Sequence, residues 1–349
     1  MRNHSRAFIQ ISIVGIVVAL SIFCVVRARG REAITETPPP FEQHSVETVQ
    51  PLALWTVYWN VEDLPEGIQT QQAAMNTLSF FAASFDTTDN VWIPKQTTNA
   101  LGYVQHTYPE RGWKHYLTIV NDCVKLDGGV SLKDTQLLQR LFKDKQVMAK
   151  HIENVIEVAL EGGYEGIEID YEGIGKDREL WKQFSLFCES LYHEATQKNL
   201  TVRVLLEAGA PLDKIQLPQG PEYGVMCYNL HGYGTEAGPK ATDKWLQEIV
   251  EKAKNIPGEK VFILPKGGFA WAKSGQGEAI TQREATQRQT KYAIKVIRDE
   301  ESQALHYTYQ DTEGESYVVW YADEKTLIHW KEVLKKRGVE KLGVWYIGG

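Results

Sequence analysis

Three carboxylates alternate with apolar side chains along one short run in the middle of the chain. The run Gly166–Tyr171 continues into Glu172 and reads Gly-Ile-Glu-Ile-Asp-Tyr-Glu. In a β-strand, successive side chains point to opposite faces, so Glu168, Asp170 and Glu172 would share one face. Strands of a parallel sheet are usually apolar on both faces, and burying unpaired charge is costly. The run therefore favours a closed sheet whose interior carries polar chemistry.

The rest of the chain supports a closed parallel sheet. Beyond Leu52, short strand-like runs alternate with stretches whose apolar residues recur every three or four positions, as in amphipathic helices. Eight such units in about 300 residues predict a (β/α)8 TIM barrel. The eight strand-like runs are Leu54–Val61, Asn76–Ala82, Tyr116–Val120, Gly166–Tyr171, Thr201–Leu206, Gly224–Asn229, Lys260–Pro265 and Leu342–Ile347.

One interval is too long for a single crossover helix. Between the seventh and eighth runs lie a helix-like stretch, Ala279–Val296, and two strand-like runs, Leu305–Gln310 and Tyr317–Tyr321. We expect a small α+β insertion at about residues 275–325. It would wall one side of a cleft at the catalytic end of the barrel.

The N-terminus carries the strongest membrane signal. Ala7–Val26 is an uncharged, mostly apolar run with arginines on both sides, long enough for a helix to cross a bilayer. The arginines that follow it disfavour signal-peptide cleavage, and a buried helix is the alternative. We therefore expect a single transmembrane helix within residues 1–31, a polar, proline-bearing linker over 32–50 and the barrel over 51–349.

Composition excludes several classes of function. The formal net charge of −7 leaves no basic field for nucleic acid. The four cysteines, Cys24, Cys123, Cys188 and Cys227, show no CxxC or metal-ligand spacing, which favours buried free thiols. We expect a monomer with no metal and no cofactor.

The three acids suggest proton chemistry. Crowded carboxylates raise one another's pKa and keep a proton among them near neutral pH, which is what a general acid requires. Two alternatives remain open: an exposed strand whose acids face water, and a divalent metal site. The second lacks a neighbouring His or Asn ligand.

At these residues the chain resembles glycoside hydrolase family 18, the chitinase-like barrels, whose signature is DGxDxDxE. Glu165 and Glu168 stand where the signature has Asp, and Asp170 and Glu172 match its last two acids. The longer Glu168 side chain would alter how Asp170 shares its proton.

Other segments extend the resemblance over about residues 52–349. Met226–Asn229 is similar to the family's MxYD motif, with Asn229 in place of Asp. Gly238–Ala241 is similar to the GPxA stretch of spore-cortex and cell-wall members. Trp320 lies in a run similar to the VWY of the insertion, and Trp345 in one similar to the last strand.

The resemblance implies retaining hydrolysis assisted by the substrate's own 2-acetamido group. Glu172 would protonate the leaving oxygen, Asp170 would orient the acetamido group, and Tyr228 would bind its oxygen. Glu168, Asn229, Met226, Trp320 and Trp345 would contact the sugar, with Trp345 beneath the ring.

The implied substrate is a β-1,4-linked N-acetylglucosamine glycan, either peptidoglycan or a chitin-type polymer. Such polymers lie outside the cytoplasm, so we expect the barrel to be extracytoplasmic and anchored through residues 7–26 of a bacterial-type membrane protein. A silent lectin on the same barrel is the main rival. The retained Asp170 and Glu172 argue against it, and the altered Glu168 and Asn229 argue for it. A third reading, an intracellular barrel enzyme, would be separated by protease access in intact cells.

Overall fold

The computed structural model describes residues 51–125, 129–275 and 277–349. They fall within one compact unit. The predicted membrane anchor, residues 7–26, and the linker, residues 32–50, lie outside the described residues. Within the described ranges, no helix has both the length and the apolar character that crossing a bilayer requires.

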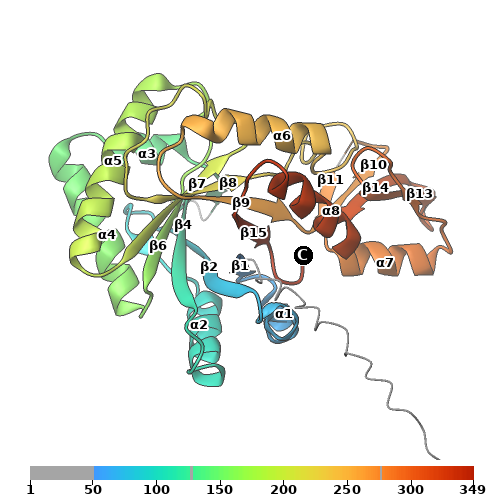
Figure 1. The fold of residues 1–349 in the computed structure, drawn as a ribbon, viewed down its shortest axis with the longest axis horizontal. Helices are drawn as coiled ribbons and strands as arrows, with labels where there is room; N and C mark the ends of the chain where they lie inside the picture. The colour runs from blue at the N-terminus through green and yellow to red at the C-terminus, as the bar shows by residue number, and fades with distance from the viewer. Residues whose placement is uncertain (1–50, 126–128, 276) are drawn as a thin grey trace, which may run out of the picture. The chain divides into compact units, whose positions relative to one another are not determined.

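Eight parallel strands close into a barrel, as the alternating pattern predicts (Figure 1). Each barrel strand pairs with the next barrel strand along the chain, including β2 with β4. The last barrel strand, β15, pairs with β1 and closes the ring. The barrel strands are β1 (Leu52–Val57), β2 (Met75–Phe85), β4 (Lys114–Val124), β6 (Gly166–Asp170), β7 (Thr201–Glu207), β8 (Glu222–Met226), β9 (Lys260–Pro265) and β15 (Lys341–Trp345).

Helices cover the outside of the barrel and follow most strands. The stripe on α5 that includes Leu180, Phe184 and Leu191 is buried, and Asp177 caps the helix by accepting two backbone N–H groups. The helices are α1 (Leu64–Gln71), α2 (Lys95–Thr107), α3 (Thr135–Leu141), α4 (Lys145–Glu161), α5 (Arg178–Gln197), α6 (Asp243–Lys252), α7 (Gln282–Lys291) and α8 (Glu324–Lys335), with 3₁₀ turns η1 (Val61–Asp63) and η2 (Ala253–Asn255).

The fifth unit departs from this alternation. Residues 208–221, which join β7 to β8 and are all described, contain no helix. The segment runs as an extended loop across the flank of the barrel beside α5. Together with α5, this loop lines a hollow on the outer surface.

Strand ends differ from the sequence-based bounds where the backbone turns. The sixth run was expected to reach Asn229, but β8 ends at Met226. Asn229 adopts a φ of 68°, in the left-handed region that a strand cannot continue through. The strands β2 and β4 run longer than predicted, and they extend to pair with the short strands β3 (Val91–Trp92) and β5 (Val130–Ser131).

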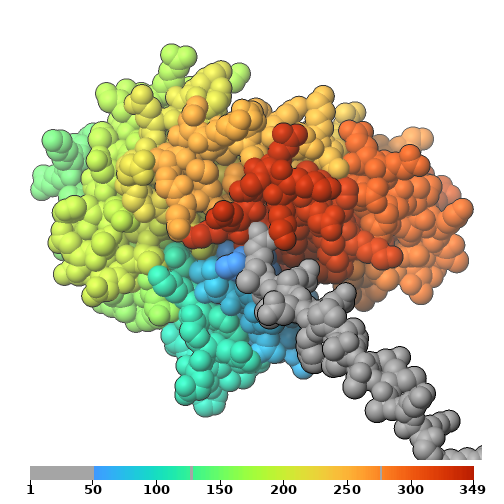
Figure 2. All heavy atoms as spheres, in the orientation of Figure 1, coloured from blue at the N-terminus to red at the C-terminus, as the bar shows by residue number. Residues whose placement is uncertain are grey.

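A second, antiparallel sheet lies between β9 and α8 in the chain. Its five strands, β10 (Gly267–Ala272), β11 (Gly277–Ile280), β12 (Ile297–Arg298), β13 (Leu305–Gln310) and β14 (Ser316–Ala322), have the order β11-β10-β14-β13-β12 and are joined by α7. The sheet begins at Gly267, earlier than residue 275, because the chain reverses there at a φ of 61°. In Figure 2 its atoms, in orange, lie against the red atoms of the C-terminal part of the chain, to which α8 belongs.

Candidate active site

The predicted acids and aromatics gather where barrel strands end. Asp170 is the last residue of β6 and Glu172 follows it, Asn229 follows β8, and Trp345 closes β15. The carboxyl ends of parallel strands meet at one face of a barrel, and TIM-barrel enzymes react there.

Glu168 lies deepest of the three acids and has no exposed surface. Its carboxylate accepts hydrogen bonds from Trp55 Nε1 (2.6 Å), Thr118 Oγ1 (2.7 Å) and Ser79 Oγ (3.1 Å). Arg203 Nη1 completes the set at 2.9 Å. These donors come from β1, β4, β2 and β7, so the Glu168 carboxylate connects β6 to four other strands inside the barrel. Its partners occupy the carboxylate that the sequence suggested for substrate contact.

Arg203 is a buried cation that the sequence reading did not single out. It bonds Glu222 through Nε at 2.6 Å as well as Glu168, and its guanidinium carbon lies 4.4 Å from the Tyr116 ring centroid. Although desolvation opposes its charge, Glu222 and Glu168 hold the pKa of Arg203 above its usual value. The only sequence signal was an arginine inside an otherwise apolar strand-like run.

Asp170 lies one step nearer the opening and is nearly fully buried. Burial, and then the charges of Glu172 and Glu168, raise the pKa of Asp170 well above its usual value. Its Oδ1 atom is buried and has no hydrogen-bond partner. A buried polar atom left unpaired is unfavourable in the free protein, so this oxygen is available to a donor from a ligand.

Glu172 sits at the mouth of the barrel on a fixed backbone. Asn121 on β4 clamps it, with Oδ1 accepting the Glu172 N–H at 2.9 Å and Nδ2 donating to the Glu172 carbonyl at 3.0 Å. The side chain is 18% exposed. Because one side chain holds both backbone polar groups of Glu172, its carboxyl extends from a fixed backbone at the end of β6.

Two residues outside the acidic strand set the charge of Glu172. Lys133 Nζ lies 2.5 Å from Glu172 Oε2 and 3.4 Å from Glu207 Oε1, and Glu207 Oε2 accepts the Gly173 N–H at 2.9 Å. Burial, followed by a hydrogen bond with Glu207, raises the pKa of Glu172 to about 7, and Lys133 opposes this shift. Against desolvation, bonds from Glu172 and Gly173 hold the pKa of Glu207 below its usual value.

Two of the aromatic residues that the sequence suggested for the site, Tyr228 and Trp345, lie side by side. Tyr228 and Trp345 are stacked, with ring centroids 6.4 Å apart at 18°, over a buried cluster that includes Met226. Burial, then the charge of Asp170, raises the pKa of the Tyr228 hydroxyl, so it stays protonated and able to donate a hydrogen bond. Met226, which the sequence suggested for sugar contact, is buried in that cluster and is not among the residues that line the cleft.

A cleft of about 480 Å³ opens between the barrel and the inserted sheet. Asn229 lines it, as do Trp59, Tyr228, Lys240, Trp345 and Tyr346. Trp320 is not among the lining residues. Its ring stacks on His306 with centroids 4.3 Å apart, and this contact holds it in the inserted sheet.

Lys133, Glu207, Asn121 and Trp59 complete the site although the sequence pattern did not select them. Glu207 had one signal, since it directly follows the strand-like run Thr201–Leu206. Lys133 had none, because it lies in a loop and reaches Glu172 across 39 residues of sequence. Its φ of 51° is unusual for a residue with a side chain, and it shows only in the folded chain.

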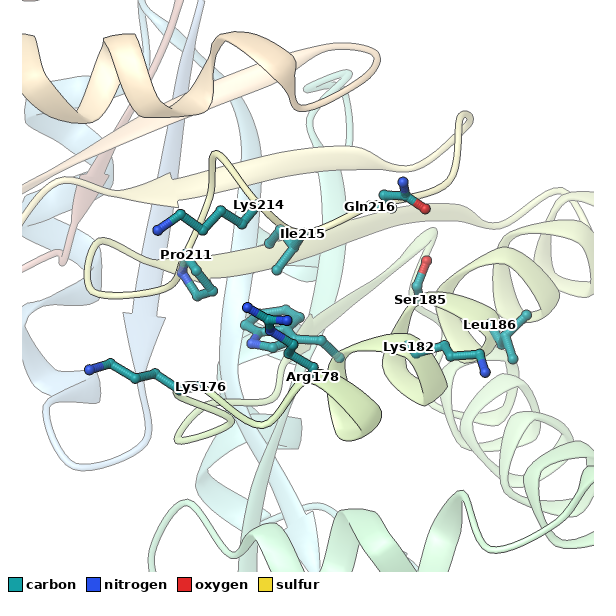
Figure 3. Close-up of a pocket in the computed structure, with 10 residues that line it drawn as sticks. Lys176, Arg178, Lys182, Ser185, Leu186, Pro211, Lys214, Ile215 and Gln216 are labelled. Atoms are coloured by element: carbon teal, nitrogen blue, oxygen red, sulfur yellow. The ribbon is translucent and has the colours of Figure 1, made fainter.

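A second hollow, of about 720 Å³, lies on the flank of the barrel (Figure 3). It runs between the start of α5 and the loop that replaces the missing helix. Figure 3 shows Lys176 and Lys214 toward one end, Arg178 in the middle, and Leu186 and Gln216 at the other. None of the described residues that line this hollow is a carboxylate, so the hollow has no candidate general acid.

Comparisons with known proteins agree with the fold. No family model matches the chain. Relatives include the glycosylase YdhD of Bacillus subtilis, described as sporulation-specific, at 23% identity over 68% of this chain and 59% of its own. Another is the cortical fragment-lytic enzyme of Bacillus anthracis, at 23% identity over 60% of this chain and 52% of its own. The chain thus spans little more than half the length of these relatives.

Solved structures share the barrel. A chitinase from Chromobacterium violaceum superimposes with a TM-score of 0.71 at 16% identity, covering 86% of this chain and 94% of its own. The spore cortex-lytic enzyme SleL of Bacillus cereus gives 0.69 at 18% identity, covering 86% and 71%. At such identities the likeness shows the fold. The resemblance that the motifs indicated is confirmed: this chain is similar to the chitinase-like barrels of glycoside hydrolase family 18 and to their bacterial spore and cell-wall branch.

Proposed function

We propose that this protein is a retaining glycosidase that hydrolyses β-1,4-linked N-acetylglucosamine glycans. Its relatives are named glycosylases, chitinases and cortex-lytic enzymes, which supports a glycoside hydrolase. One observation carries the proposal: a carboxyl with a pKa of about 7, on Glu172, beside a buried Asp170 oxygen that lacks a partner.

In the proposed reaction, Glu172 donates its proton to the glycosidic oxygen as the bond to the anomeric carbon breaks. The oxygen of the sugar's own 2-acetamido group attacks that carbon and forms a cyclic oxazolinium. Glu172, now a carboxylate, takes a proton from the water that opens the ring. The protein supplies no nucleophile of its own. The first proton leaves on the departing hydroxyl, the oxygen of water bonds to the anomeric carbon as the oxazolinium C–O bond breaks, and the proton from water restores the Glu172 acid.

Asp170 would serve the acetamido group during this attack. Its unpartnered Oδ1 can accept the acetamido N–H, which becomes more acidic as the oxazolinium forms. Tyr228 would donate to the acetamido oxygen, since its raised pKa keeps the hydroxyl protonated. The Trp345 indole, stacked beside Tyr228, offers an apolar face for the sugar ring.

We expect the replacement of the motif's Asp by Asn229 to change the rate of hydrolysis more than the type of reaction. It lines the cleft where the motif carries Asp, so it can hydrogen-bond the sugar without adding negative charge. A lectin remains the alternative because of this change and that at Glu168.

The test is digestion of purified peptidoglycan and of chito-oligosaccharides by the full-length chain, with products compared by mass spectrometry. We expect new reducing N-acetylglucosamine ends from the wild type and none from Glu172→Gln. Glycan binding without cleavage by either form would refute the enzyme and leave the lectin.

We also propose that the barrel works outside the cytoplasm, held by a helix within residues 7–26, since polymers of this kind lie there. Protease added to intact cells should then degrade the barrel. Protection equal to that of a cytoplasmic marker would contradict this location.

A further inference from the structure

Lys240 is a cation inside the candidate cleft, and the reaction proposed above does not use it. It lines the same cavity as Tyr228, Asn229 and Trp345. Its Nζ atom donates to the Lys266 carbonyl at 3.0 Å and lies 5.3 Å from the Phe269 ring centroid. One neutral acceptor and one aromatic face therefore surround an ammonium that can donate three hydrogen bonds.

The surroundings of Lys240 leave its charge unbalanced. In the part of the chain that the structure describes, no carboxylate lies within ion-pair distance of its Nζ atom, although the chain as a whole is acidic. Burial alone lowers the pKa of Lys240 to about 8, with no neighbouring charge to counter it. A cation held with few partners gains strongly from an incoming anion.

The other charges of the cleft are already engaged or lie at its rim. Arg283 pairs with Asp63 at 2.8 Å, and Glu284 caps α7 by accepting the Thr281 N–H. Glu62 is exposed, and Lys266 adds a second positive charge to the cavity wall. Among the described residues that line the cleft, Lys240 and Lys266 are thus the two cations that no ion pair engages.

The backbone of residues 230–240 holds Lys240 in its place at the cleft. The Leu230 N–H donates to the Lys240 carbonyl at 3.0 Å, which ties the end of the loop to the strand exit that carries Tyr228 and Asn229. At Gly238 a Cβ would lie 2.5 Å from the His231 ring, so only glycine allows the loop to close so tightly. Lys240 is thus presented to the cleft on a braced turn.

We propose that Lys240 binds a carboxylate carried by the sugar itself, so that the cleft recognises an acidic N-acetylhexosamine glycan. The lactyl group of N-acetylmuramic acid offers such a carboxylate in peptidoglycan strands from which the stem peptide has been removed, whereas chitin has no charge to offer. The inference rests on the proposed function and names its substrate class: a muramyl glycan in preference to a neutral one.

Binding to an inactive protein tests this without requiring cleavage. The full-length Glu172→Gln chain would be titrated calorimetrically with three tetrasaccharides: alternating N-acetylglucosamine and N-acetylmuramic acid without peptide, the same compound with its lactyl groups amidated, and chitotetraose. A hydrogen bond to a charged group predicts about 10- to 100-fold tighter binding of the free acid than of the amide.

Substitutions then assign the preference to one residue. Lys240→Met should reduce the ratio of acid to amide affinity to near one, and Lys240→Arg should keep most of it. Lys214→Met is the matched control, because it removes an equal charge from the hollow of Figure 3 outside the cleft. It should leave the ratio unchanged.

Equal affinity for the acid and the amide would overturn the inference, as would a preference that survives Lys240→Met or disappears equally in Lys214→Met. If Lys240→Met does not fold, the comparison of acid with amide on Glu172→Gln decides. If the wild type cleaves the glycan but does not prefer the acid to the amide, only the inference about Lys240 is refuted. If binding shows a Lys240-dependent preference for the acid and no glycan is cleaved, only the proposed enzymatic activity is refuted.

Discussion

Lys133 and Glu207 act on Glu172 with opposite sign, so replacing them should move the pH dependence of activity in opposite directions. A general acid must be protonated, so kcat/KM falls as the pH rises through its pKa. Lys133 favours the Glu172 carboxylate and Glu207 favours its acid form. Lys133→Met should therefore shift the basic limb to higher pH, and Glu207→Gln should shift it to lower pH.

The size of the Lys133 effect is limited by water. At 2.5 Å and an effective dielectric constant of about 20, Coulomb's law gives about 7 kcal/mol, which is an upper bound. The Lys133 side chain is 47% exposed, and exposed ion pairs contribute about 0.2–1 kcal/mol. An intermediate value of about 1.4 kcal/mol moves the limb by about one pH unit.

The assay is kcat/KM on one chromogenic N-acetylglucosaminide between pH 4 and about 9, for the wild type and both variants. Methionine keeps the length and apolar stem of Lys133, and it meets the same backbone restriction at a φ of 51°. Any shift therefore reports the lost charge.

Two results would refute this reasoning. Basic limbs that coincide in all three proteins would mean that the limb does not report Glu172. Limbs that move in the same direction would mean that a conformational change, rather than opposite charges, links these residues to the acid.

Three further substitutions test separate parts of the site. Glu168→Gln should lower the free energy of unfolding by about 3–5 kcal/mol in urea, because it leaves Arg203 without its fully buried partner; a change under ~1 kcal/mol would contradict the buried pair. Asp170→Asn should reduce kcat by about 10²–10³-fold. Its Tm at pH 7 should match or exceed that of the wild type, since a pKa raised on folding opposes stability above the unfolded pKa; lower Tm would assign Asp170 a structural role. Trp345→Ala should raise KM about tenfold or more, with Trp345→Phe nearer the wild type, and equal KM values would remove Trp345 from the sugar site.

The sequence predicted the barrel well because its signals are local. Alternating and helical periods lie within single elements, so the eight strands fell within a few residues of their observed ends. The end of β8 was predicted wrongly because the left-handed backbone at Asn229 leaves no mark on the pattern of apolar and polar residues. The loop 208–221, which lacks a helix, was likewise invisible to a count of strands.

Pairings across the barrel could not be predicted in this way. The pattern placed Glu168, Asp170 and Glu172 on one face and treated them alike. Which acid is balanced depends on Arg203, 35 residues from Glu168, and on Lys133, 39 residues from Glu172. Such contacts exist only after the strands have closed into a barrel.

The closed barrel gives the three acids three different environments, and this division supports the proposed chemistry. Glu168 is matched by Arg203 and three neutral donors, so its charge is spent on holding the strands together. Asp170 next to it has no partner at Oδ1, and its neighbours' charges disfavour ionisation. Glu172 reaches the solvent edge, where Lys133 and Glu207 tune it near neutrality. The negative charge of Glu168 raises the pKa of Asp170, whereas its ion pair with Arg203 supplies a positive charge beside it. The ion pair thus holds the strands beneath the site, while Lys133 and Glu207 act on the acid that the proposed reaction uses.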